Sequence, residues 1–139
     1  MKKTKIPKAC KDLLIQAARE AAQQAYCPYS NYPVGAAVLA EDGQVYSGCN
    51  VENASYGLTM CAERVAIFKA ASHGCRTFAA LAVVGGSAAK PASPCGACRQ
   101  VFAEFATAET PVFIAPLGKG GRVTETTLGA LLPMAFEKE

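Results

Sequence analysis

The sequence predicts an α/β protein in which helices pack on the faces of a mixed β-sheet. A hairpin-like pair of strand patterns comes first, and strand and helix patterns alternate after it. The 139 residues match the size of one domain, and the hydrophobic fraction of 51% is enough for a substantial core. We therefore expect residues 1–139 to form a single domain, and the high apolar content favours self-association.

Two helices and two strands are predicted in the first half of the chain. Apolar side chains recur at three- and four-residue spacing over residues 13–25, which predicts an amphipathic helix. Residues 34–39 and 44–49 have the composition of two short strands, and the Glu-Asp-Gly sequence between them indicates a hairpin turn. After a polar segment, a second helix is expected over residues 61–73, with Gly74 as its left-handed cap.

The second half continues the alternation of strands and helices. Residues 78–84 are continuously apolar, which is typical of a central strand covered on both faces. A loop rich in Gly, Ser, Ala and Pro precedes a third helix at 95–106 and a strand at 111–115. A short last strand at 122–124 and a closing helix at 126–132 complete the predicted fold.

Charged residues are unevenly distributed along the chain, with 14 Lys and Arg side chains against 11 acidic ones. Five lysines precede the first acidic residue: Lys2, Lys3, Lys5, Lys8 and Lys11. Without them, nine basic and eleven acidic side chains remain, whereas a polynucleotide-binding body carries a clustered basic surface. We expect residues 1–9 to form a flexible basic tail and expect no nucleic-acid partner.

The chain shows no pattern of membrane insertion or secretion. No apolar run approaches the ~20 residues that cross a bilayer, and the N-terminus lacks the apolar core of a signal peptide. A cytoplasmic location without membrane contact is therefore expected. The seven cysteines are an odd number, which favours reduced thiols, some of them metal ligands, over a disulfide framework.

Two segments that open predicted helices, residues 61–63 and 94–98, carry the side chains of a metal site. Thiols near a helix N-terminus face the positive end of the helix dipole, which lowers their pKa. Three thiolates from Cys61, Cys95 and Cys98 would bind one zinc ion and leave its fourth position open to water, as in catalytic zinc sites.

Glu63 and two arginines flank these cysteines. Glu63 follows Cys61 by two residues and is placed to exchange a proton with water activated by the metal. Arg64 and Arg99 directly follow Glu63 and Cys98, and we expect one or both to donate hydrogen bonds to the sulfurs. The alternative for both arginines is an exposed position on a helix.

A structural zinc site, closed by Cys49 or His73 as a fourth ligand, is the alternative to a catalytic one. His73 lies at the predicted end of a helix, where a capping role is ordinary. The four cysteines outside the two segments occur singly and are expected to be small buried residues: Cys10, Cys27, Cys49 and Cys75.

Three motifs together resemble the small, homotetrameric class of zinc-dependent cytidine deaminases. They are Asn50-Val51-Glu52-Asn53, Cys61-Ala62-Glu63-Arg64 and Pro94-Cys95-Gly96-Ala97-Cys98-Arg99-Gln100, and the similarity extends over residues 13–136. The resemblance implies a three-layer α/β/α sandwich around a mixed five-stranded sheet. It also implies one zinc ion per subunit and active sites completed by neighbouring chains of a homotetramer.

The implied activity is the hydrolytic deamination of cytidine and deoxycytidine to uridine and deoxyuridine, with release of ammonia, in pyrimidine salvage. Zinc-activated hydroxide attacks C4 of cytosine while Glu63 shuttles the proton. Asn50 and Glu52 match the positions that hold the ribose 3′-hydroxyl. Tyr32 matches an aromatic residue near the nucleoside, often Phe in relatives.

Two further aromatic residues, Tyr56 and Phe136, match side chains that reach in from other subunits. A carboxylate at Glu52 repels phosphate, so single nucleosides are expected as substrates rather than 3′-linked nucleotides.

Two other functions remain open from the sequence. One is deamination of a modified cytosine nucleoside, such as a blasticidin-type antibiotic, and Asn50 and Glu52 favour the ordinary nucleoside over it. The other is a non-catalytic, zinc-stabilised module, against which Glu63 beside a three-ligand site is the main argument.

Overall fold

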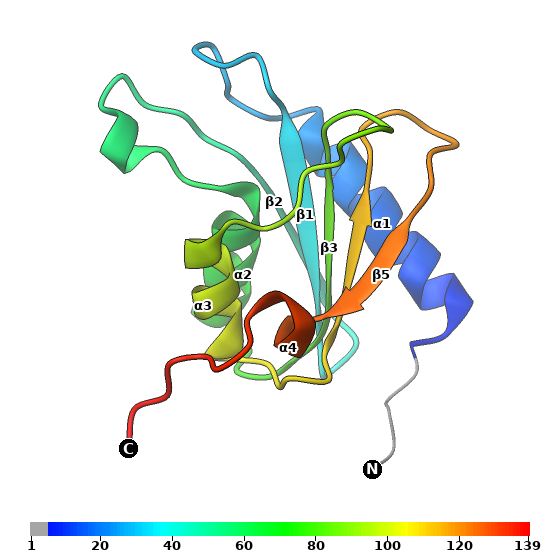
Figure 1. Ribbon diagram of the computed structural model, residues 1–139, viewed down its shortest axis with the longest axis vertical. Helices are drawn as coiled ribbons and strands as arrows, with labels where there is room; N and C mark the ends of the chain where they lie inside the picture. Colours follow the sequence, from blue (N-terminus) through cyan, green and yellow to red (C-terminus); the bar gives the residue numbers. More distant parts are fainter. Residues whose placement is uncertain (1–5) are drawn as a thin grey trace.

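The computed structural model describes residues 6–139 and shows one five-stranded sheet between two helical layers (Figure 1). The strands lie in the order β2-β1-β3-β4-β5. Their bounds are Val34–Ala40 (β1), Val45–Cys49 (β2), Phe78–Gly85 (β3), Pro111–Ala115 (β4) and Thr124–Thr127 (β5). Only β3 and β4 pair in parallel, and the other three neighbouring pairs are antiparallel. The predicted mixed sheet is confirmed, with β3 at its centre.

The helices divide between the two faces of the sheet. Their bounds are Lys8–Ala22 (α1), Ala62–Ser72 (α2), Gly96–Ala103 (α3) and Leu128–Leu131 (α4), and a 3₁₀ turn η1 spans Tyr56–Leu58. One buried cluster joins α1 to the sheet, and a second joins α2, α3 and α4 to the other face. The three-layer sandwich is thus confirmed. None of the described helices combines the length and hydropathy needed to cross a bilayer.

The central strand β3 explains why its sequence is apolar throughout. Leu81 and Val83 pack in the cluster with α2 and α3, whereas Ala82 and Val84 pack in the cluster with α1. Because side chains alternate across a strand, burial on both faces requires an unbroken apolar run.

The close approach between β2 and α2 fixes the position of the N-terminal end of α2. A β-carbon added at Gly48 would lie 2.6 Å from the backbone nitrogen of Ala66 and 2.9 Å from the carbonyl oxygen of Ala62. Such distances are well inside van der Waals contact, so only glycine lets the first turns of α2 lie directly on β2. Cys61, the N-cap of α2, is positioned by this contact.

The N-terminal helix begins earlier than predicted. Lys8 and Ala9, expected in a flexible tail, already lie in α1, while residues 1–5 of that tail lie outside the described part of the chain. Lys8 pairs with Asp12 at 2.9 Å, and the Lys11 ammonium lies 5.2 Å from the ring centre of Phe113. The first contact is an ion pair within the first turn of the helix, and the second is a cation–π interaction. Hydrophobic periodicity does not predict either of them.

The C-terminal elements also differ in extent from those predicted. The last strand is Thr124–Thr127, which starts two residues and ends three residues later than expected, because Thr126 pairs with Val112 of β4. The closing helix is therefore reduced to the single turn Leu128–Leu131, whose Ala130 N–H donates to the Thr127 hydroxyl at 3.2 Å.

Candidate active site

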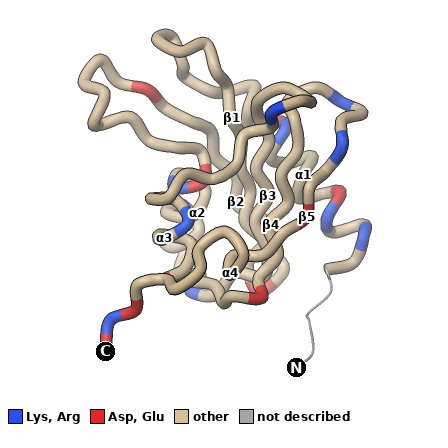
Figure 2. The backbone as a smooth tube through the Cα atoms, in the orientation of Figure 1, with Lys and Arg blue, Asp and Glu red and all other residues tan. Residues whose placement is uncertain are grey.

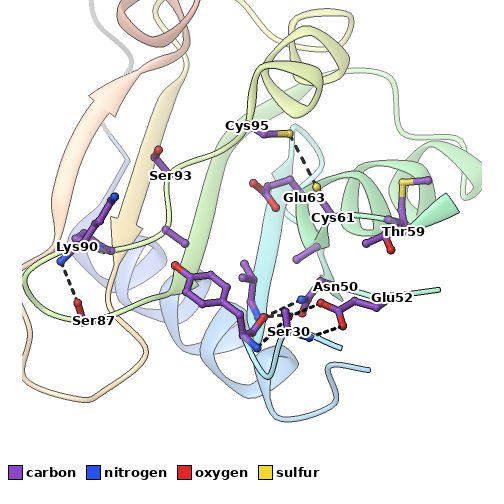
Figure 3. Close-up of a pocket in the computed structure, with 16 residues that line it drawn as sticks. Ser30, Asn50, Glu52, Thr59, Cys61, Glu63, Ser87, Lys90, Ser93 and Cys95 are labelled. Carbon is purple, nitrogen blue, oxygen red and sulfur yellow. Dashed lines mark hydrogen bonds between the residues drawn. The ribbon is translucent and has the colours of Figure 1, made fainter. Parts of the chain in front are cut away.

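Three cysteine thiols meet where α2 and α3 begin. Cys61 is the N-cap of α2, Cys95 is the N-cap of α3, and Cys98 lies in the first turn of α3. The Sγ atoms of Cys61 and Cys95 are 3.9 Å apart (Figure 3). Those of Cys95 and Cys98 are 3.4 Å apart. All three sulfurs lie within 4.8 Å of one another. The structure therefore brings together the three predicted ligands.

The spacing of the sulfurs fits a tetrahedral zinc ion. Sulfur ligands about 2.3 Å from zinc, at tetrahedral angles, lie about 3.8 Å from each other. The observed separations of 3.4 and 3.9 Å bracket that distance. Within residues 6–139 the cluster contains these three cysteines alone, so neither Cys49 nor His73 closes it. Such a donor set leaves one position for water, as catalytic zinc sites require.

Arg64 supplies a positive charge to the thiol cluster. Its Nη2 donates to Sγ of Cys61 at 3.3 Å, and its Nε is buried without a partner among the described atoms. Hydrogen bonding from Cys98, assisted by Arg64, lowers the pKa of Cys61 to about 5 in the metal-free chain, against the opposing effect of burial. The pKa of Cys98 is raised because its thiol proton is shared with Cys61 and its site is desolvated. The site therefore favours a thiolate even without metal.

Arg99 makes different contacts from those expected. Its Nε donates to the carbonyl of Pro94 and its Nη1 to the carbonyl of Leu131, both at 2.7 Å. Of the two arginines considered as donors to the sulfurs, only Arg64 makes that contact. Arg99 instead ties the segment before Cys95 to α4, because two backbone carbonyls occupy its guanidinium.

Glu63 lies beside the thiols in the wall of a cavity of about 780 Å³ (Figure 3). Its side chain belongs to the first turn of α2, and the residue is 4% exposed. Burial raises the pKa of Glu63 to about 7, and the negative charge on Cys61 adds to the rise, while its own backbone N–H and Arg64 act against it. A carboxyl group with a pKa near neutrality can both accept and donate a proton, as general acid/base catalysis requires.

The residues expected at the sugar and base also line this cavity, but they have partners within the chain. The Asn50 side chain donates to the carbonyl of Tyr32 and accepts from the N–H of Val34, both at 2.9 Å. Glu52 accepts hydrogen bonds from the segment that precedes Tyr32. Tyr32 itself lines the cavity and is 45% exposed. Asn50 thus braces the backbone that carries Tyr32.

Tyr56 and Phe136 lie outside the cavity of their own chain. Tyr56, in η1, is 79% exposed and lines a separate hollow of about 360 Å³ with Tyr29. Phe136 is 74% exposed, and its carbonyl accepts a hydrogen bond from Gln100 at 3.1 Å. The segment that carries η1 projects from the body of the fold (Figure 1).

Several cavity residues were not predicted from the sequence. They are polar side chains from the segments around residues 30, 59 and 90: Ser30, Thr59, Ser87, Lys90 and Ser93. All come from loops, where helical and strand periodicity gives no signal. Their pattern of Ser, Thr and Pro marked only that loops were present.

This fold and this cluster of thiols beside a buried carboxyl define a zinc-dependent deaminase. Residues 8–114 match the family model described as the cytidine and deoxycytidylate deaminase zinc-binding region. The cytidine deaminase of Sporosarcina psychrophila is 56% identical over 126 residues, which cover 91% of this chain and 90% of that protein. The chain belongs to the cytidine deaminases, zinc-dependent hydrolases that replace the 4-amino group of cytosine with oxygen.

Other relatives agree with this family. The cytidine deaminase of Halalkalibacterium halodurans is 51% identical, with 93% of this chain and 96% of that protein covered. The crystal structure of cytidine deaminase from Burkholderia pseudomallei has a TM-score of 0.83 and 51% identity, and the match covers 90% of this chain and 98% of that one. A blasticidin-S deaminase of Bacillus cereus is only 27% identical, with 78% of this chain and 80% of that protein covered, so the antibiotic alternative is disfavoured.

Proposed function

We propose that this chain, as a single domain, hydrolyses cytidine and deoxycytidine to uridine and deoxyuridine with zinc held by Cys61, Cys95 and Cys98. The observation that carries the proposal is that three thiols with tetrahedral spacing share one cavity with the buried carboxyl of Glu63. Zinc in such a site supplies a Lewis acid that makes water a nucleophile near neutral pH.

Glu63 moves the protons of the reaction. Its carboxylate accepts a proton from the water that attacks C4 and delivers that proton to N3 of the cytosine ring. It then takes the proton of the new C4 hydroxyl and passes it to the amino group, which leaves as ammonia while the C4 carbonyl forms. A pKa raised by burial suits both directions of transfer.

Arg64 adjusts the charge of the ligand set. Three thiolates around a divalent ion leave a net charge of about −1, which weakens the attraction for a nucleophilic oxygen. A hydrogen bond from Arg64 to Sγ of Cys61 withdraws electron density from that sulfur and offsets this effect.

The other end of the cavity receives the sugar. Asn50 and Glu52 lie there with Tyr32, and the Glu52 carboxylate accepts a hydrogen bond from a sugar hydroxyl while repelling phosphate. Lys and Arg side chains of the described residues are spread over several elements (Figure 2), which also favours a single nucleoside over a polynucleotide.

We further propose that the chain works as a cytoplasmic homotetramer in pyrimidine salvage, with Tyr56 and Phe136 completing the cavities of neighbouring subunits. Both side chains are largely exposed, as are Leu58 and Met134, so the isolated chain leaves much apolar surface uncovered. Light scattering gives the oligomeric state. Mixing Glu63→Gln with Phe136→Ala subunits then tests shared sites, because hybrid tetramers should recover activity that neither variant has alone.

The central experiment measures zinc per chain and cytidine turnover on one sample. We expect one zinc ion per chain, turnover followed by ultraviolet absorbance, and a Glu63→Gln variant that keeps zinc but loses roughly 10²- to 10⁴-fold in rate. X-ray absorption should show three sulfur ligands and one light atom. Four protein donors, or zinc-loaded protein without turnover, would overturn the proposal and favour a non-catalytic module.

A further inference from the structure

Ser30 contacts both Glu52 and the backbone of Tyr32 at the edge of the cavity (Figure 3). Oε1 of Glu52 accepts from the N–H of Tyr29 at 3.0 Å and from the N–H of Ser30 at 3.2 Å. The Ser30 hydroxyl donates to Oε2 of the same carboxylate. One short segment therefore holds Glu52 by three hydrogen bonds, 22 residues away in the sequence.

These hydrogen bonds leave Glu52 with one free direction. A carboxylate has about four lone-pair positions, and the two on Oε1 are both used. On Oε2 the Ser30 hydroxyl takes one position, which leaves one for a ligand. The carboxylate can therefore accept one further hydrogen bond, at Oε2.

The direction of the Ser30 hydroxyl is itself fixed. Its oxygen accepts a hydrogen bond from the N–H of Tyr32 at 3.1 Å. Since an ionised carboxylate only accepts, the hydroxyl proton must point toward Glu52. The same interactions lower the pKa of Glu52, with the Ser30 hydroxyl as the main cause, so the carboxylate stays ionised at neutral pH.

The Glu52 carboxylate lies between two cavities, so it needs a hydrogen bond to keep its direction. Ser30, Glu52 and Thr59 line the 780 Å³ cavity and also the neighbouring hollow of about 360 Å³, so they form the partition between the two. Without a bond at Oε2, the carboxylate has room to turn out of the nucleoside cavity. The two backbone N–H groups hold only the other oxygen.

We propose that Ser30 is a positioning residue that presents Oε2 of Glu52 to the 3′-hydroxyl of the bound nucleoside. This inference rests on the proposed role of Glu52 at the sugar. Ser30 does not touch the reacting C4 group, so its effect falls on binding of the sugar rather than on proton transfer.

The test compares cytidine with 3′-deoxycytidine, which lacks the hydroxyl that Oε2 would accept. For Ser30→Ala, KM for cytidine should rise by about tenfold and kcat should stay within about twofold, while KM for 3′-deoxycytidine should change by less than about twofold. Ser30→Thr keeps the hydroxyl and should restore cytidine binding. Ser72→Ala, a serine substitution at the far end of α2, is the matched control and should leave KM unchanged for both substrates.

The outcomes separate the inference from the function on which it rests. An equal change in KM for both substrates in Ser30→Ala, or no change for either, overturns the role of Ser30 if Glu52→Gln raises KM for cytidine more than for 3′-deoxycytidine. If Glu52→Gln also changes KM equally for the two substrates, the proposed role of Glu52 fails and the inference fails with it. Should Ser30→Ala not fold, Ser30→Cys replaces it, because a thiol is a weak donor of similar size and should behave as Ala.

Discussion

Nη2 of Arg64, in the first turn of α2, lies 3.3 Å from Sγ of Cys61, the N-cap of that helix three residues earlier. The contact follows from helical geometry, since residues three apart share a face. It places a guanidinium against the thiol of Cys61, whose pKa is lowered to about 5. A cation and a thiolate thus face each other before any metal binds.

Removing this cation should change both thiol chemistry and catalysis. In Arg64→Gln, turnover of the zinc enzyme should fall by roughly 10- to 100-fold, because a hydrogen bond to a charged group is lost. In the metal-free variant the pKa of Cys61 should rise, so alkylation of Cys61 near pH 6 should slow relative to the wild type. Peptide mapping by mass spectrometry measures this, and unchanged alkylation would show that Arg64 does not tune the thiol.

The buried carboxyl of Glu63 should make the metal-free protein sensitive to pH. Its pKa rises from an ordinary 4.5 to about 7 in the fold, so the fold favours the protonated form. Below pH 4.5 the carboxyl group is protonated in both the folded and the unfolded chain, so its burial carries no charge penalty. As pH rises toward 7, the free energy of unfolding falls, by on the order of 3 kcal/mol in total.

Glu63→Gln has no charge to bury and provides the reference for this effect. The free energy of unfolding of metal-free wild type, measured in urea and relative to the variant, should fall across that pH window. A difference that stays constant with pH would contradict the raised pKa.

Gly48 should be intolerant of even one added carbon. In Gly48→Ala the new β-carbon meets the backbone of α2 at 2.6 and 2.9 Å, so α2 must shift. We expect a loss of about 1–3 kcal/mol in stability and a fall in turnover, because Cys61 and Glu63 move with the helix. Gly118→Ala is the control, since nothing lies within 4 Å of its β-carbon. Equal melting temperatures for the two variants would refute the close-packing argument.

Arg99 should support the ligand segment rather than the chemistry. Arg99→Lys can reach only one of the carbonyls of Pro94 and Leu131, so the segment before Cys95 loosens. Thermal stability should fall by about 1–3 kcal/mol and zinc should dissociate faster, while kcat of the zinc-loaded fraction stays near that of the wild type. A fall in kcat at full zinc occupancy would instead indicate a direct role at the sulfurs. Chelator competition and calorimetry measure these quantities.

The two arginines show where sequence reasoning succeeds and where it stops. Arg64 contacts the sulfur of the N-cap of its own helix, three residues earlier, which is a local relationship visible in the spacing. Arg99 occupies a similar place in its motif, but its partners are Pro94 and Leu131. The second of these belongs to α4, and nothing in the motif indicates that a carbonyl from that helix lies within reach.

The same limit applies to the cavity and the helix ends. The sequence predicted Asn50 and Glu52 as cavity residues by resemblance, but it gave no indication that Ser30 holds Glu52 or that Asn50 braces Tyr32. The sequence also placed the start of the first helix too late. The Lys11 ammonium lies over the ring of Phe113, about a hundred residues further along the chain, and such a contact leaves no local pattern from which the helix start could be predicted.

The order of strands and helices, the mixed sheet and the thiol set at two helix starts were determined by the sequence itself. Hydrophobic periodicity, turn residues and the helix dipole act over a few residues, so their effects can be predicted from residues that are close in the sequence. The tertiary structure alone decided which partner each polar side chain finds, as with Glu52 and Ser30 or Arg99 and Leu131. Those partners lie in segments far apart in the sequence, a loop in one case and α4 in the other, which meet only after the sheet has formed. A hydrogen bond depends on that final distance and direction.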